Sequence, residues 1–183
     1  MKVKLFVLLI VIAMSTSAFA VSDISIGPIF GMNVPLVNKD AKSGSMIGFQ
    51  AKYSPIPMFA IGAHYQDRKF GDPSEEFFYG TDTKDGGSIA SLGVDAYFGK
   101  TSGTGVNFYL MGSLGTYKWK RENQDEVSKA TYSIGPGLEI VLPMKLGIEG
   151  RAMFDIAPTG ESGSWKALLW FVGVNYHMGL GPM

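Results

Sequence analysis

Residues 146–155 read Leu-Gly-Ile-Glu-Gly-Arg-Ala-Met-Phe-Asp, and this stretch decides the fold class. The even-numbered positions carry Leu, Ile, Gly, Ala and Phe, whereas the odd-numbered positions carry Gly, Glu, Arg, Met and Asp. Side chains alternate between the two faces of a β-strand, so this order places an apolar face opposite a mainly polar one. Helical spacing does not fit the segment, and the pattern therefore predicts a strand.

The same alternation recurs along most of the chain. The alternating segments are 24–34, 47–53, 59–66, 91–98, 106–115, 132–140, 146–155 and 168–177. Their polar faces hold mainly Gly, Ser and Asn with a few charges, which suits the crowded lumen of a small barrel better than a solvated sheet surface. We therefore expect an all-β fold, an eight-stranded antiparallel up-and-down transmembrane β-barrel whose apolar face points at lipid.

The connections between these segments alternate in length. Short connections are expected at 54–57, at 99–104 and around Pro143. Longer, polar connections are expected at 35–44, 69–87, 120–128 and 157–164. Short periplasmic turns and longer extracellular loops are typical of outer-membrane barrels. Pro28 and Pro136 each remove a backbone donor inside an expected strand, so we predict a bulge or a strand rim at both positions.

The N-terminal segment has the features of an export signal. Lys2 and Lys4 precede an apolar core at 5–14, and Ala18-Phe19-Ala20 forms a small-residue cleavage site. The apolar core is shorter than the about 20 residues that a membrane-spanning helix needs. We predict a cleaved signal peptide at 1–20 and a barrel domain at 21–183, exported through the periplasm to the outer membrane of a Gram-negative-type bacterium.

Composition excludes several classes of function. The 183 residues include no Cys, so neither a disulfide framework nor a thiol-based site is available. The 16 basic and 16 acidic residues cancel, which argues against a nucleic-acid partner that needs a basic surface. The two His residues stand in no His-x-Ser arrangement, and a nucleophile needs a base within hydrogen-bond reach. We expect no catalytic residue, no cofactor and no specific metal site.

Taken together, residues 21–183 resemble the small bacterial outer-membrane β-barrels, the OmpA/OmpX-like and opacity-protein-like group often described as porin-like. The resemblance rests on the strand pattern over the whole mature chain. It implies insertion by the barrel-assembly machinery, contact with outer-membrane lipid and lipopolysaccharide, and a structural or surface-interaction role without catalysis. The long loops would then meet an extracellular partner, with Phe77, Phe78 and Tyr79 as a surface contact.

Face parity places a set of polar side chains in the expected lumen. They are Lys52, His64, Asp95, Glu139, Glu149 and Arg151, with Asp155 nearer the long-loop rim. An Arg beside two carboxylates in a narrow lumen indicates a plug of paired charges, because an unpaired buried charge is costly. One alternative is a narrow OmpW-like channel for small or apolar solutes. A second is a soluble, periplasmic, lipocalin-like ligand binder with its apolar face turned inward.

Overall fold

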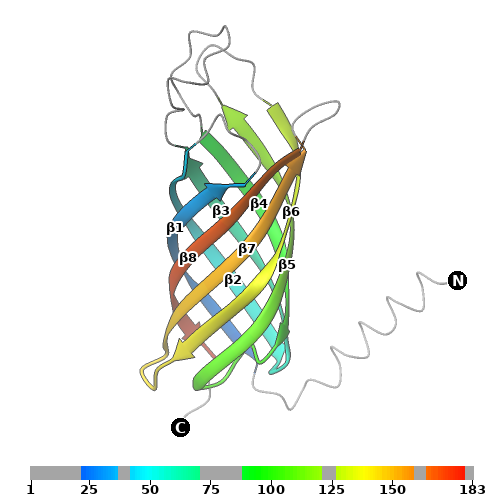
Figure 1. Ribbon diagram of the computed structural model, residues 1–183. Helices are drawn as coiled ribbons and strands as arrows, with labels where there is room; N and C mark the ends of the chain where they lie inside the picture. Colours follow the sequence, from blue (N-terminus) through cyan, green and yellow to red (C-terminus); the bar gives the residue numbers. More distant parts are fainter. Residues whose placement is uncertain (1–21, 37–41, 71–87, 121–126, 159–163, 180–183) are drawn as a thin grey trace, which may run out of the picture.

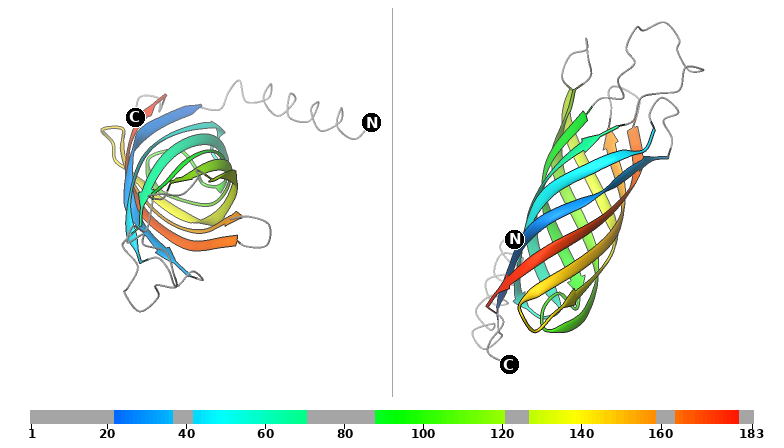
Figure 2. Two further views of the ribbon diagram at one scale, coloured as in Figure 1. Left: turned by 90° about the horizontal axis from the view of Figure 1, so that it is seen from above. Right: turned by 90° about the vertical axis from the view of Figure 1, so that its left-hand side faces the viewer.

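The chain forms a closed barrel of eight antiparallel strands (Figure 1). The computed structural model describes residues 22–36, 42–70, 88–120, 127–158 and 164–179. The strands are β1 (Asp23–Pro35), β2 (Gly44–Ile56), β3 (Phe59–Lys69), β4 (Ser88–Gly99), β5 (Gly105–Lys120), β6 (Val127–Val141), β7 (Leu146–Pro158) and β8 (Ser164–Met178). Each strand pairs with its neighbours in sequence, and β8 closes the ring against β1 (Figure 2). The predicted fold class is confirmed.

The ends of the strands follow the predicted alternation of connections. Residues 57–58, 100–104 and 142–145 join strands at one end of the barrel, and the longer intervals between strands fall at the other end (Figure 1). The segment predicted as a signal peptide, 1–20, lies outside the described residues, so its cleavage remains a prediction. Among the described residues no helix is long and apolar enough to cross a membrane.

Apolar side chains cover the outside of the barrel. Leu92 and Phe108 expose 61% and 62% of their surface, whereas the inward-facing Gln50 and Glu149 expose 1% and 0%. A surface of this kind is stable in hydrocarbon and not in water. The orientation contradicts the lipocalin-like alternative, which needs the apolar face inside.

The two prolines that we expected at a bulge or a rim lie at neither. The β1–β8 ladder is interrupted at Gly27 and Pro28 and resumes in the same register, and the β6–β7 ladder is interrupted likewise at Gly135 and Pro136. A side chain on either glycine would overlap a backbone carbonyl of the neighbouring strand. Glycine therefore permits close strand approach where proline cannot donate a hydrogen bond. The β2–β3 ladder instead shifts its register between Tyr53 and Ile56.

Candidate functional site: the lumen network

An ion pair between two residues of β7 occupies the middle of the lumen. Arg151 Nη2 lies 2.8 Å from Glu149 Oε2, and Arg151 Nε donates to Glu149 Oε1 at 2.9 Å. Gln50 on β2 donates to Glu149 and accepts from Arg151, so one amide serves both charges. Tyr109 on β5 donates to the same carboxylate. All four side chains are buried, and the charges are therefore satisfied by protein groups.

A second cluster lies at the short-turn end and centres on Glu139 of β6. Lys52 Nζ lies 2.6 Å from Glu139 Oε2, and Asn175 Nδ2 donates to Glu139 Oε1 at 2.7 Å. His177 Nε2 lies 3.0 Å from Glu139 Oε1, and His177 Nδ1 lies 2.6 Å from Asp23 Oδ2. Two carboxylate acceptors at the two ring nitrogens require the doubly protonated imidazolium. Asn175 also donates to Glu149 at 3.0 Å and so joins the two clusters.

His64 and Asp95 form a third contact, between β3 and β4. His64 Nδ1 lies 2.9 Å from Asp95 Oδ1, and Tyr97 Oη donates to Asp95 Oδ2 at 3.3 Å. In a Ser-His-Asp arrangement the serine hydroxyl is hydrogen-bonded to the imidazole. Ser91 Oγ, a second buried hydroxyl on the lumen face of β4, has no hydrogen-bond partner. The pair links β3 to β4 on the lumen side of the wall.

Toward the long-connection end, Arg68 of β3 pairs with Asp155 of β7. Arg68 Nη1 lies 2.7 Å from Asp155 Oδ2, and Gln66 Oε1 accepts from Arg68 Nε and Nη2 at 3.2 and 3.0 Å. Ser133 Oγ and Thr131 Oγ1 donate to Asp155 Oδ1 at 2.6 and 3.1 Å. Sequence reasoning missed Arg68, because it lies beyond the clean alternation at 59–66. The parity of His64 and Gln66, continued by one pair of residues, would have found it.

Aromatic rings fill the space around the central cations. The Arg151 guanidinium lies 5.3 Å from the Tyr97 ring centroid and 4.9 Å from that of Phe171. Lys52 Nζ lies 5.4 Å from the Tyr109 ring centroid. The Tyr97 and Tyr109 rings meet edge to face at 5.3 Å. These contacts favour the cations in place and take up the middle of the lumen.

Charges of both signs therefore meet in pairs along the lumen. The six residues predicted for the lumen all point inward and are buried, and they fall into three contacts, Lys52–Glu139, His64–Asp95 and Glu149–Arg151. The other members, which sequence analysis did not name, are Asp23, Gln50, Gln66, Arg68, Tyr97, Tyr109, Thr131, Ser133, Asn175 and His177. Most of them occupy the alternate positions that form the polar face of their strands. This alternation is the sequence signal that could have identified them.

Two further features bear on chemistry. Within the described ranges, no group of three or more His, Cys, Asp or Glu side chains is placed to hold a metal ion. The predicted surface contact, Phe77, Phe78 and Tyr79, lies outside the described residues. The arrangement inside the barrel can hold charges of both signs in pairs and brace strands against one another.

Comparisons with known proteins agree on the architecture. No protein-family model matches the sequence, and no curated protein matches it. Neisserial surface protein A gives a TM-score of 0.59 at 9% identity over 87% of this chain and 97% of that chain. The N-terminal barrel domain of OprF from Pseudomonas aeruginosa gives 0.53 at 17%, over 87% and 98%. Ail, the attachment invasion locus protein of Yersinia pestis, gives 0.50 at 18%, over 86% and 97%.

At these identities the likeness shows the fold, which is that of small outer-membrane barrels. A closed eight-stranded ring leaves no unpaired sheet edge in the hydrocarbon, and this barrel carries apolar side chains around its outside. The fold and the apolar surface together locate the protein in a bacterial outer membrane.

Proposed function

We propose that the protein is a non-enzymatic outer-membrane barrel with a structural and surface-interaction role, whose lumen is plugged by its own polar side chains. The observation that carries the proposal is the central network of Arg151, Glu149, Gln50 and Tyr109, in which every member is buried and bonded to another. Eight strands leave room for little beyond side chains. A lumen filled by this bonded network braces the wall and opposes the passage of solutes.

The other parts of the role concern export and the surface. Residues 1–20 serve as the export signal, and the barrel-assembly machinery inserts residues 21–183. Outward positions near the long-connection end carry Lys69, Lys118, Lys120 and Lys166, at the level where lipopolysaccharide phosphates lie. Ail has been solved with the heparin analogue sucrose octasulfate. An anionic surface partner therefore complements the lysine-bearing end of this barrel, and Phe77, Phe78 and Tyr79 provide further contacts.

Single-channel recording in planar bilayers tests the plug. We expect the parent protein to pass no steady current, because the paired side chains close the lumen. Arg151→Ala removes the guanidinium that links Glu149, Gln50 and the ring of Phe171, so we expect openings to appear. Lys166→Ala, on the outer face, is the matched control and should stay silent. A parent that already conducts, with no change in Arg151→Ala, would favour the narrow-channel alternative.

A further inference from the structure

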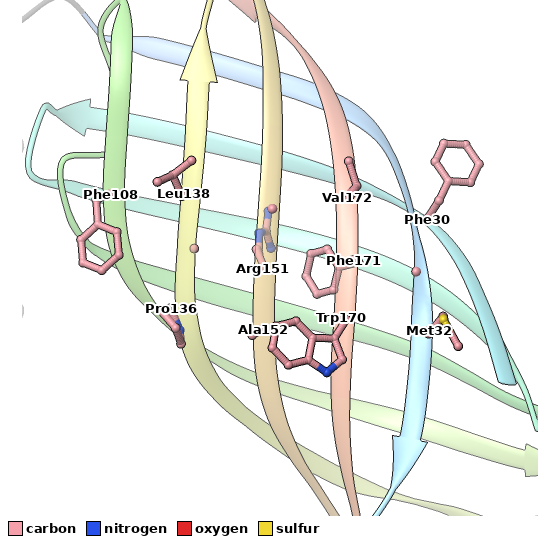
Figure 3. A pocket seen from close by; sticks show the side chains of 13 residues that line it. Phe30, Met32, Phe108, Pro136, Leu138, Arg151, Ala152, Trp170, Phe171 and Val172 are labelled. Atoms are coloured by element: carbon pink, nitrogen blue, oxygen red, sulfur yellow. The ribbon is translucent and has the colours of Figure 1, made fainter. Parts of the chain in front are cut away.

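The outer wall over β5, β6, β7, β8 and β1 contains a depression of about 580 Å³ (Figure 3). Small outward residues form its floor, namely Pro136, Gly150 and Ala152. A Cβ added to Gly150 would meet no atom within 4 Å, so the floor is open to the outside. The interruption of the β6–β7 ladder falls at the same place, beside Pro136. The wall is thus hollowed where it lacks side chains and ladder bonds.

Large apolar side chains frame this depression. They are Phe30, Met32, Phe108, Leu138, Trp170 and Val172. In Figure 3 the indole of Trp170 lies beside Ala152, across the space between β7 and β8. Large side chains around a floor of glycine, alanine and proline form a groove that suits a narrow, flexible, apolar chain.

A lysine of β8 lies outside the lining of the groove, toward the long-connection end, and its charge identifies the kind of chain. The outward face of β8 is apolar from Leu168 to Met178, and Lys166 is the next outward residue toward the long-connection end. Of the described residues that face outward on the five strands of the groove, the charged ones are Lys118 and Lys120 of β5 and Lys166 of β8. Lys166 shares its strand with Trp170 and Val172. A lysine at the edge of an apolar band lies at the level of lipid headgroups and attracts phosphate.

The depth of the groove below Lys166 matches the hydrocarbon thickness of one leaflet. At about 3.3 Å per residue, Trp170 and Val172 lie about 13 and 20 Å from Lys166 along β8. With strands tilted by about 35–45°, these become depths of about 10 and 15 Å. Half of the hydrocarbon core is about 15 Å thick. The same tilt displaces Trp170 sideways from Lys166 by about 8–9 Å. An acyl chain that follows the direction of β8 from a phosphate at Lys166 therefore reaches the groove.

We propose that this groove is a binding site for one anionic membrane lipid, with its phosphate at Lys166 and one acyl chain against Gly150, Ala152 and Trp170. The proposal does not depend on the plugged lumen, and it rests on the surface part of the proposed function, which places Lys166 at the level of lipid phosphates. It requires only that the barrel lies in a bilayer. A second copy of the protein is the other occupant that an apolar wall can accept, and the experiment separates the two.

Trp170 provides the reporter. In a Trp119→Phe, Trp165→Phe background, the refolded barrel is placed in phosphatidylcholine vesicles that contain a small fraction of phosphatidylglycerol with brominated acyl chains, which quench indole on contact. We expect Trp170 to be quenched as if that lipid were enriched about fivefold at the groove, the ratio that one lysine at an anionic surface supports. Brominated phosphatidylcholine at the same fraction should quench only in proportion to its amount.

Matched variants make the result specific. Lys166→Gln should bring quenching down to the phosphatidylcholine level, and Gly150→Leu or Ala152→Leu should do so by filling the floor. Lys69→Gln and Ala63→Leu, outward changes on β3, should leave the enrichment intact. Equal quenching by the two lipids in the parent, or no effect of filling the floor, would overturn the proposal. A folded barrel in which neither lipid quenches Trp170 would also overturn it, because protein would then cover the groove.

Discussion

Arg151→Ala should lower the free energy of unfolding of the vesicle-embedded barrel by about 3–5 kcal/mol, the usual cost of removing one partner of a buried ion pair. The change takes two hydrogen bonds from Glu149 and one from Gln50, while the carboxylate stays buried among protein groups. Urea titration followed by gel mobility of unheated samples measures the loss, since a folded barrel migrates differently from the unfolded chain.

The double variant Arg151→Met, Glu149→Gln is the control for this result. It removes both charges of this pair and keeps most of the side-chain volume, so Glu149 is no longer left as an unpaired charge. Replacing a buried ion pair by uncharged groups is often neutral or stabilising. We therefore expect most of the lost stability to return. A double variant as unstable as Arg151→Ala would mean that packing around the guanidinium, and not the unpaired Glu149, sets the cost.

The strand faces were predictable because one residue in two has to meet lipid. Even β8, where Leu169 and Phe171 enter the lumen, keeps Trp170 and Val172 outward and exposed. An apolar side chain at an inward position can fill space in the lumen, as Phe171 does by packing against the Arg151 guanidinium. The alternation of the two faces can therefore still be recognised when some inner-face residues are apolar, provided that the outer face is apolar throughout.

The pairing of charges across the lumen was not predictable from the sequence. Parity placed Lys52, Glu139 and Glu149 on the same side of the wall, but it did not say which carboxylate would hold the lysine. The stagger of the strands around the closed ring decides this, and it brings Lys52 to Glu139. Closure likewise joins the two ends of the barrel chain, His177 of β8 to Asp23 of β1.

The prediction of a bulge or a strand rim at the two prolines was wrong, because it assumed that a proline needs an irregular strand. The chain solves the problem with a Gly-Pro pair, used at 27–28 and again at 135–136, and keeps its register on both occasions. The preceding glycine lets the neighbouring strand come close. The missing donor therefore interrupts the hydrogen-bond ladder locally and leaves the strand register unchanged. The second of these interruptions lies at the floor of the outer groove.

Gly135→Ala should be among the most damaging single-methyl changes in this barrel. An added Cβ would overlap the carbonyl oxygen of Ala152 on β7, which is backbone and has no rotamer by which to move away. Overpacking of this kind costs about 1–3 kcal/mol or more. Gly112→Ala, on the adjacent β5, is the matched control, since its Cβ would meet no atom within 4 Å. It should stay within about 0.5 kcal/mol of the parent. Urea unfolding of both variants in the same vesicles measures the difference, and equal stabilities would show that β6 and β7 do not need close approach beside Pro136.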